Sequence, residues 1–424
     1  MQKDYFVAFE HRQPPQFPGL TKLDEAVWHI AAGLTIGLGI WYLSWRWLYS
    51  LNDDALIFAV AVAGAETAAF LGTLLFFFDI WREGDTPQKS PPKSRSAAHL
   101  SELGRLTIDV FVTTYDEGVE VVEHSMQDAA KLHAPENTDI KLHILDDGKQ
   151  SGMHDLAKRL GATYHIRLNN IGFKAGNIAA AMRRSNGDFV VICDADCRLY
   201  PSFLENTLGY FRDQNVAWVQ TPHWFYDVPA GRDRALPSGK KRPLRGILRG
   251  TLALFLGRKS GTDPFMADPS VFFDIIQRRR NRNHASFCCG AASIHRREAI
   301  MEEALSRWGS DAQKTSAGAS EQVTPICRLI ALQPFRYHVS EDILTSIDLH
   351  KKGWKSVYHP KVEARMLSPL SAHAWATQNL KYAGGTFDIM LRHNPLFSSG
   401  LNWRTKLHYA ATFYSYLTFL IFPH

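Results

Sequence analysis

The chain has 424 residues, of which 45% are hydrophobic and 12% aromatic, and its formal net charge is +6. This length exceeds a typical single domain and allows roughly two or three units, each with a buried core. Because the net charge is modest, we exclude a general nucleic-acid-binding protein; the basic excess is concentrated in residues 232–282, with thirteen Arg or Lys and four Asp. That stretch could face anionic lipid headgroups or a pyrophosphate, or it could be a solvated loop, and both interpretations stay open.

The N-terminal part predicts a helical membrane hairpin over residues 27–80, preceded by a cytosolic segment over residues 1–26. Residues 27–48 are apolar for about the length that a bilayer requires, and aromatic residues crowd their far end. Residues 55–80 repeat the pattern with Glu66 inside, which we interpret as a paired packing residue. Neither helix is followed by a cleavage site of the kind that ends a signal peptide.

The amino-acid composition changes after residue 80, and a new domain follows. Residues 81–100 are rich in Pro, Ser and Lys and predict a juxtamembrane linker, whose basic excess places the following domain on the cytosolic side. Residues 101–370 then alternate short apolar runs with helical patterns, which predicts an α/β fold with a mostly parallel sheet and helices on both faces. The predicted strands cover 107–113, 141–145 and 189–193, and the predicted helices lie near 119–133 and 155–160.

Two segments interrupt this alternation, residues 229–268 and 306–322, and we expect both to be loops. Beyond the domain, residues 371–402 are expected to form interfacial helices. Residues 403–424 begin another apolar helix, which we expect to be the truncated start of a C-terminal transmembrane region.

Five cysteines, at positions 193, 197, 288, 289 and 327, lack the paired Cys-x-x-Cys motifs of a zinc site. The odd number is typical of a reduced, cytosolic domain. Cys193 and Cys197 flank an acidic motif, and we expect them to fill space beside it instead of binding metal.

Three acidic clusters, at residues 146–147, 194–196 and 340–342, follow apolar runs that we expect to be strands of one sheet, the last run being FRYHV at 335–339. Ligands of open α/β sheets bind beyond the carboxyl ends of the strands, so these clusters are candidate site residues. In the Asp194-Ala195-Asp196 motif the two carboxylates project to the same side and can share a Mg²⁺ or Mn²⁺ ion with substrate phosphates. Such an ion suits a nucleoside diphosphate that leaves during sugar transfer.

Transfer of a sugar to a hydroxyl also requires a general base. Asp342 is the candidate, because it lies between the apolar run FRYHV and a predicted helix. The alternative is that residues 340–342 only cap that helix and complement its dipole. We favour the base because two further acidic clusters accompany it.

The ordered motifs resemble those of family 2 glycosyltransferases, in particular bacterial cellulose synthase and related processive β-glucan synthases. The resemblance runs from about Thr107 to Arg392 and implies a GT-A-like fold flanked by transmembrane helices. It implies that Asp342 is the catalytic base and that Asp194 and Asp196 bind metal. It further implies two sets of contacts. Donor contacts would come from Thr114, Tyr115, Glu117, Asp146, Asp147, Lys174, Asp194, Gln378 and Lys381, and acceptor contacts from His223, Cys289, Gly290, Glu341 and Tyr382.

The chain departs from the family pattern in its last motif. Cellulose synthases carry Gln-x-x-Arg-Trp on an interfacial helix, whereas this chain has Gln378-Asn379-Leu380-Lys381-Tyr382. Lys381 meets a pyrophosphate as a point charge without the fork of Arg, and Tyr382 stacks on a sugar with a smaller face than Trp. Together with the long basic segment, this departure suggests a sibling enzyme that makes β-1,3-linked (curdlan-like) or mixed-linkage glucan.

Three hypotheses follow. The first is a processive, inverting synthase in the bacterial inner membrane that polymerises glucose from UDP-glucose and passes the polysaccharide between its helices, with membrane lipids and an accessory export subunit as further partners. The second is a non-processive transferase that adds one sugar to a lipid. The third is a silent membrane subunit that binds a nucleotide sugar. We favour the first, because the chain keeps all three acidic clusters and an aromatic residue in the last motif.

Overall fold

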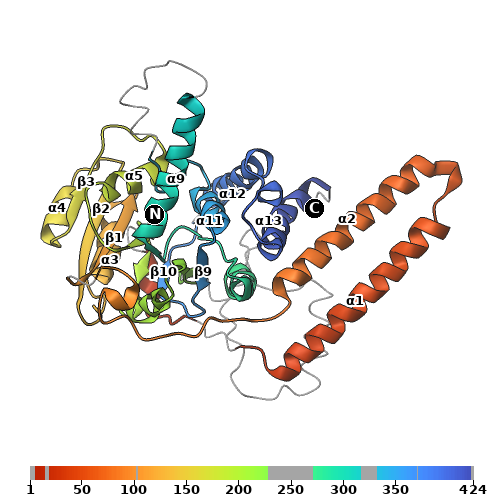
Figure 1. The fold of residues 1–424 in the computed structure, drawn as a ribbon, viewed down its shortest axis with the longest axis horizontal. Coiled ribbons are helices and arrows are strands. Elements are labelled where there is room, and N and C mark those ends of the chain that lie inside the picture. The colour runs from red at the N-terminus through yellow and green to blue at the C-terminus, as the bar shows by residue number, and fades with distance from the viewer. Residues whose placement is uncertain are drawn as a thin grey trace.

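The computed structural model describes residues 5–14, 19–101, 104–227, 271–316, 332–369 and 371–421. An apolar helical hairpin projects from an α/β domain, and two C-terminal helices lie between the hairpin and that domain (Figure 1). The basic segment predicted as a loop at 229–268 lies outside the described residues.

The hairpin consists of α1 (Lys22–Tyr49) and α2 (Leu56–Ile80), joined by the short turn η2 (Asp53–Ala55). By length and composition, both helices could cross a membrane. The Glu66 carboxylate of α2 lies 3.0 Å from the Arg46 guanidinium of α1, so it pairs within the hairpin as predicted. The two helices predicted from sequence are therefore present.

The central sheet has seven strands in the order β3-β2-β1-β4-β8-β6-β9. All neighbouring strands are parallel except β8, which runs antiparallel to both β4 and β6. The mostly parallel sheet predicted from sequence is confirmed. Its strands are β1 (Leu106–Thr114), β2 (Thr138–Asp146), β3 (Thr163–His165), β4 (Phe189–Asp194), β6 (Val216–Gln220), β8 (Ser293–Arg296) and β9 (Lys355–Tyr358).

Helices cover both faces of this sheet, because its inner strands are apolar on both sides. Ile108, Val110 and Val112 of β1 pack with α3, α4 and α6 on one face, while Phe111 packs with α5 and α9 on the other. These helices are α3 (Val119–Ala129), α4 (Met153–Arg159), α5 (Phe173–Met182), α6 (Phe203–Thr207) and α9 (Arg297–Ser316). Cys193 and Cys197 are buried in the first of these two cores, as space-filling residues would be.

A second sheet of three short strands lies beside the end of β4 in the chain. Its order is β5 (Arg198–Leu199), β10 (Ala364–Met366) and β7 (Trp224–Phe225). Strand β10 runs antiparallel to β5 and parallel to β7. Because β5 begins two residues after Asp196, this small sheet supports the metal motif predicted from sequence.

The C-terminal helices form a separate apolar cluster. Helix α11 (Glu341–Lys351) packs with α12 (Ala372–Arg392) and α13 (Trp403–Ile421) through residues such as Ile347, Ile389 and Tyr409. The remaining short elements are the helical turns η1 (Tyr5–Phe9), η3 (Ser96–Ala98), η4 (Leu208–Arg212), η5 (Val271–Gln277), α8 (Arg278–Arg280), η6 (Asn281–Asn283) and η7 (Pro395–Phe397).

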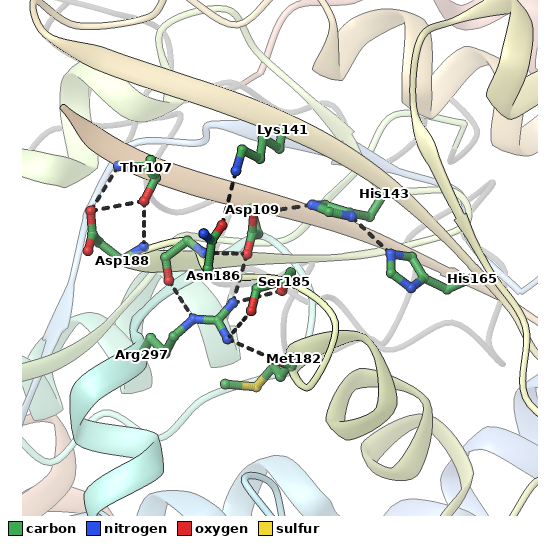
Figure 2. A network of polar contacts seen from close by, with 11 residues as sticks. Thr107, Asp109, Lys141, His143, His165, Met182, Ser185, Asn186, Asp188 and Arg297 are labelled. Atoms are coloured by element: carbon green, nitrogen blue, oxygen red, sulfur yellow. Dashed lines mark hydrogen bonds and ion pairs between the residues drawn. The ribbon is translucent and has the colours of Figure 1, made fainter. Parts of the chain in front are cut away.

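A buried ion pair holds the loop between α5 and β4. Arg297, the first residue of α9, donates to the Asp109 carboxylate at 2.7 Å and to main-chain oxygens of Met182 and Ser185 at 3.0 and 3.3 Å (Figure 2). Asp109 is fully buried and also lies 3.2 Å from the His143 ring. This network fixes the segment that connects two predicted site elements.

The described end of the basic stretch, residues 278–282, is a structural junction and not a solvated loop. Arg280 lies 2.5 Å from Asp79 near the end of α2, and Arg278 lies 2.7 Å from Asp85 in the linker. Arg279 donates to the Ile80 carbonyl at 2.8 Å. The three side chains are buried, so this part of the stretch binds the hairpin and cannot present its charges to lipid headgroups or a pyrophosphate.

Two predicted elements were wrong. Residues 306–316 of the predicted polar loop continue helix α9, while residues 317–322 lie outside the described part of the chain. The apolar run FRYHV at 335–339 forms no strand. Its amides bond to side chains instead: Arg336 N donates to Thr345 Oγ1 at 3.1 Å and Tyr337 N to Gln333 Oε1 at 3.2 Å.

Candidate active site

The carboxyl ends of three neighbouring strands bring the first predicted residues together. Thr114 at the end of β1 pairs in register with Asp146 of β2, and Thr113 pairs with Asp194 of β4. Parallel strands present these residues at one edge of the sheet, where ligands of α/β proteins bind. The strand-end clusters at 146–147 and 194–196 therefore occupy the predicted edge.

Asp147 is held by an arginine that the sequence motifs do not reveal. Arg167 donates from Nε to Asp147 Oδ1 at 2.6 Å and from Nη2 to Asp147 Oδ2 at 2.5 Å, a bidentate pair, and Asp147 is buried. Arg167 also donates to the Phe173 carbonyl at 2.8 Å. It therefore ties the second strand end to the start of α5.

Two glycines allow these segments to approach so closely. A Cβ at Gly148 would lie 1.6 Å from the Tyr115 carbonyl oxygen, and a Cβ at Gly176 would lie 2.0 Å from the Ile171 carbonyl oxygen. Any larger residue at either position would push the predicted donor-binding segments apart.

Asp146 and Glu117 shape the main chain of this pocket. The Asp146 carboxylate accepts from Lys149 N at 2.8 Å, Gln150 N at 2.9 Å and the Tyr164 hydroxyl at 2.9 Å. Glu117 accepts from the Thr114 hydroxyl at 3.0 Å and from Tyr115 N at 2.8 Å. Through these hydrogen bonds both acidic side chains support the loops around the pocket. The Tyr115 side chain is exposed.

Lys174 forms the centre of the site. Its Nζ lies 2.5 Å from Asp194 Oδ1, and the Asp194 side chain keeps 46% of its surface exposed. Burial disfavours the charged lysine, but the negative charges of Asp194 and Glu341 raise its pKa above the usual value. Although burial opposes ionisation of Asp194, the Lys174 ammonium lowers the pKa of this carboxyl. The pair is thus ionised and ready to meet a charged ligand.

Asp196 is held in a different way. Its Oδ2 accepts from Leu367 N at 3.0 Å. Burial and the nearby charge of Asp194 raise the pKa of Asp196 to about 7. Two carboxylates that repel one another in this way are a suitable environment for a divalent cation, which removes the repulsion.

The two carboxylates fit a cation that takes further ligands from its substrate. Among the residues that the structure describes, no group of three or more His, Cys, Asp or Glu side chains forms a complete metal site. Mg²⁺ in particular is usually bound by one or two carboxylates together with substrate phosphates. The donor set of Asp194 and Asp196 is of this kind.

The third acidic cluster begins helix α11 and faces the same centre. Asp342 Oδ1 accepts from Ile343 N at 2.8 Å, and a small cavity beside it is lined by Lys174, Gly290 and Glu341. Burial and the charge of Asp342 raise the pKa of Glu341 to about 8, and burial also raises the pKa of Asp342. The predicted strand before this cluster was wrong, yet the cluster still reaches the edge formed by β1, β2 and β4.

The segment 288–292 forms a wall of the site and depends on Gln220. The Gln220 amide accepts from Cys289 N at 2.8 Å and donates to the Ala291 carbonyl at 2.9 Å. Gly290 has a φ of +86°, and a Cβ built there would lie 3.4 Å from Lys174 Nζ and 3.8 Å from Asp342 Oδ2. The main chain at Gly290 thus approaches the catalytic candidates directly.

His223 and Cys289 complete this wall. The His223 ring lies 2.9 Å from the Ala291 carbonyl, and burial lowers its pKa to about 4. Burial raises the pKa of the Cys289 thiol, so this residue stays neutral. Both side chains are therefore uncharged near neutral pH.

Helix α12 brings Tyr382 to the site. Its ring is about half exposed, at 51%, while partial burial and the charges of Asp342 and Asp194 raise the pKa of its hydroxyl. Gln378 and Lys381 lie on the same helix, and Lys381 is exposed. Within the described part of the chain, neither forms a hydrogen bond or ion pair with the acidic clusters.

The sequence motifs reveal neither the pairing of Arg167 with Asp147 nor the hydrogen bonds by which Gln220 holds the segment 288–292. Arg167 lies in a loop after the short strand β3, outside any motif, so no local signal marks it. Gln220 ends the buried strand β6, two residues before Pro222, and a polar residue at the end of a buried strand could have been suspected of a role.

Comparison with known proteins assigns the domain to a family. The family model described as "Glycosyltransferase like family 2" matches residues 105–385 of this chain. The chain therefore belongs to the family 2-like glycosyltransferases, as the motif resemblance predicted.

The similar proteins with assigned names include several cellulose synthases. The cellulose synthase catalytic subunit (UDP-forming) of Xanthomonas axonopodis pv. citri (strain 306) is 27% identical over 384 residues, which are 89% of this chain and 44% of the relative. Putative cellulose synthase 2 of Komagataeibacter xylinus is 29% identical over 402 residues, which are 92% of this chain and 22% of the relative. The chain thus spans less than half the length of these relatives.

Among solved structures, the mannosyltransferase PcManGT from Pyrobaculum calidifontis matches with a TM-score of 0.48 and 14% identity. The match covers 84% of this chain and 79% of that protein. A likeness this distant supports no inference about substrate.

Proposed function

We propose that this chain is the catalytic part of a membrane-embedded, processive and inverting glycosyltransferase that builds a β-glucan from UDP-glucose. The observation that carries the proposal is the convergence on Lys174 of two acidic motifs from distant segments. Asp194 lies 2.5 Å from its ammonium, and the charges of Glu341 and Asp342 also act on it. A metal motif and a candidate base thus share one centre.

In this proposal the donor is bound by the strand ends. Thr114, Tyr115, Glu117, Asp146 and Asp147 surround the nucleoside, and Lys174 contacts the diphosphate. Asp194 and Asp196 would hold a Mg²⁺ or Mn²⁺ ion, which when bound supplies positive charge to the departing diphosphate. Gln378 and Lys381 approach the same diphosphate from α12.

Asp342 acts as the general base. An acceptor hydroxyl attacks the anomeric carbon of glucose, its proton passes to the Asp342 carboxylate, and the bond to the UDP oxygen breaks on the opposite side. A single displacement of this kind inverts the anomeric centre. Burial and the charge of Asp342 raise the pKa of Glu341 to about 8, so we assign the role of base to Asp342 and not to Glu341.

The acceptor lies between Tyr382 and the wall formed by His223, Cys289 and Gly290, with Glu341 beside it. Tyr382 offers an aromatic face on which a terminal sugar can stack. The hairpin of α1 and α2 spans the bacterial inner membrane, the α/β domain is cytosolic, and the product passes between membrane helices. Membrane lipids surround the hairpin, and an accessory subunit receives the exported chain.

The test uses the full-length protein in membrane vesicles, supplied with radiolabelled UDP-glucose and Mg²⁺ or Mn²⁺. An insoluble polymer is expected, and glucanases specific for β-1,4 or β-1,3 bonds then identify a cellulose-like, β-1,3 or mixed linkage. A product with a single glucose on a lipid would contradict processivity. Absence of any transfer, with UDP still bound, would support a silent subunit.

A further inference from the structure

The segment before the hairpin, residues 5–12, docks onto the α/β domain far from it in sequence, and we name this segment the N-terminal strap. Phe6 is only 2% exposed and packs edge-on against His124 of α3, with ring centroids 5.5 Å apart. Arg12 donates to the Tyr226 carbonyl at 3.0 Å. Figure 1 places the N-terminal end over the α/β domain, away from α1.

A chain of hydrogen bonds leads from the strap to the metal motif. The Tyr5 hydroxyl donates to Asp227 Oδ2 at 2.7 Å, and the Asp227 carboxylate accepts from Ser368 N at 2.9 Å and from the Ser368 hydroxyl at 3.1 Å. The neighbouring amide, Leu367 N, donates to Asp196 Oδ2 at 3.0 Å. Asp227, which Tyr5 contacts, and Asp196 thus accept hydrogen bonds from two consecutive main-chain amides just after β10.

The strap also balances charge beneath the small sheet. Arg198 of β5 pairs in register with Arg365 of β10, and both guanidinium groups contact Asp128, at 2.7 and 3.1 Å. Glu10 of the strap pairs with Arg198, whose side chain is only 7% exposed. Without Glu10, two arginines would share the single carboxylate of Asp128. The free energy of folding would then be less favourable, because one buried positive charge would lack a counter-charge.

We propose that the N-terminal strap is a positioning element for the cation site, because it clamps the small sheet and thereby fixes the Asp196 carboxylate. The inference rests on the proposed function, in which Asp196 binds a divalent cation. None of residues 5–12 is among those proposed to bind the donor or the acceptor, so the strap should set the affinity for the cation and leave the rate of transfer at saturating cation unchanged. Outer partners of metal ligands commonly have this effect.

The experiment uses the full chain in lipid nanodiscs and compares the wild type with Tyr5→Phe and Glu10→Gln. Val7→Ala is the matched control, because Val7 lies in the strap and is 46% exposed. Hydrogen exchange is measured for a peptide covering residues 364–369, and Mn²⁺ binding is measured by electron paramagnetic resonance in the presence of UDP. Transfer of glucose is measured as a function of Mn²⁺ concentration.

Both strap variants are expected to exchange faster in residues 364–369 and to bind Mn²⁺ about tenfold more weakly, with transfer at saturating Mn²⁺ close to that of the wild type. The Val7→Ala control should match the wild type in all three measurements. Unchanged hydrogen exchange and unchanged Mn²⁺ affinity in Tyr5→Phe and Glu10→Gln would contradict the proposal that the strap positions the cation site. The proposed function would remain intact. If the wild type itself bound no Mn²⁺ with UDP, the cation site would fail, and the strap proposal with it.

Discussion

Gly385 of helix α12 packs directly against Ser340, the residue before the acidic start of helix α11. A Cβ built at Gly385 would lie 2.0 Å from Ser340 Oγ and 3.3 Å from Ser340 N. The His338 ring, two residues earlier, lies 3.0 Å from the Asp388 carboxylate of the same α12. The helix that carries Tyr382 is therefore fixed to the segment that carries Asp342.

This contact predicts that Gly385→Ala impairs transfer. The added methyl must push α12 away from Ser340, which costs about 1–3 kcal/mol and moves Tyr382 relative to Asp342. We expect polymer synthesis to fall about tenfold or more. Gly384→Ala is the control, because a Cβ there meets nothing within 4 Å; equal losses in both variants would show that helix α12 is merely sensitive to substitution.

Asp342→Asn should abolish polymer synthesis. Removing a general base typically lowers the rate about 100- to 10,000-fold. Because Asp342 lies outside the nucleoside pocket, UDP affinity measured by calorimetry should change little. Retention of more than a tenth of the wild-type rate would exclude Asp342 as the base.

Tyr382 should govern the length of the product more than the chemistry. Tyr382→Ala removes the face on which the terminal sugar stacks, and each such aromatic contact contributes about 0.5–1.5 kcal/mol. We expect shorter chains on a sizing column, while Tyr382→Trp should restore or increase their length. Product of unchanged length from Tyr382→Ala would argue that the acceptor binds elsewhere.

The pair of Arg297 and Asp109 predicts a large effect on stability. Arg297→Met leaves the fully buried Asp109 without its cation, and breaking one partner of a buried pair costs about 3–5 kcal/mol. Thermal unfolding of the purified protein should show this loss. Arg183→Met in the same connecting segment is the control, because Arg183 is exposed and should tolerate the change.

Buried neutral histidines predict acid sensitivity. Burial lowers the pKa of His295 to about 3, and burial together with the charge of His143 lowers that of His165 to about 4, from an ordinary value of 6.5. Below pH 6.5 the unfolded chain therefore binds protons that the folded chain does not, so stability is full above pH 6.5 and falls as the pH drops toward 4. Each such group contributes a slope of about 1.4 kcal/mol per pH unit in this window.

The test of this slope is His295→Gln. Melting temperatures measured between pH 7 and pH 4.5 should fall less steeply in the variant than in the wild type, even if its stability at pH 7 is lower. Parallel curves would show that His295 does not contribute to the acid sensitivity.

The sequence allowed the strand ends of the site to be predicted because local chemistry marks them. Asp146 and Asp194 each end a run of buried apolar residues, and this switch is visible without a structure. The apolar run at 335–339 is also followed by acidic residues, yet it forms no strand. Phe335 packs against the core beside α5 while its neighbours bond to side chains, and only the tertiary contacts distinguish this arrangement from a strand.

Helix α9 was not predicted, and its residues 306–316 were expected to belong to a loop. Its polar composition suggested a loop, yet the helix includes Ala, Gln and Lys, which favour helices, and an ion pair of 2.7 Å joins Glu303 to Arg307. Arg167, Tyr5 and Glu10 could not be predicted at all. Their partners, Asp147, Asp227 and Arg198, lie 20, 222 and 188 residues away, so no local pattern records the contacts.

The arginines at 278–280 make the α/β domain a poor candidate for isolation as a soluble fragment. A fragment that began after the linker would lose Asp79, the Ile80 carbonyl and Asp85, which are the acceptors of three buried guanidinium groups. Water would have to enter a packed interface, at a cost of several kcal/mol for each stranded charge. Protein engineers who wish to study the domain without detergent should therefore redesign the outer surface of the hairpin and keep its inner end.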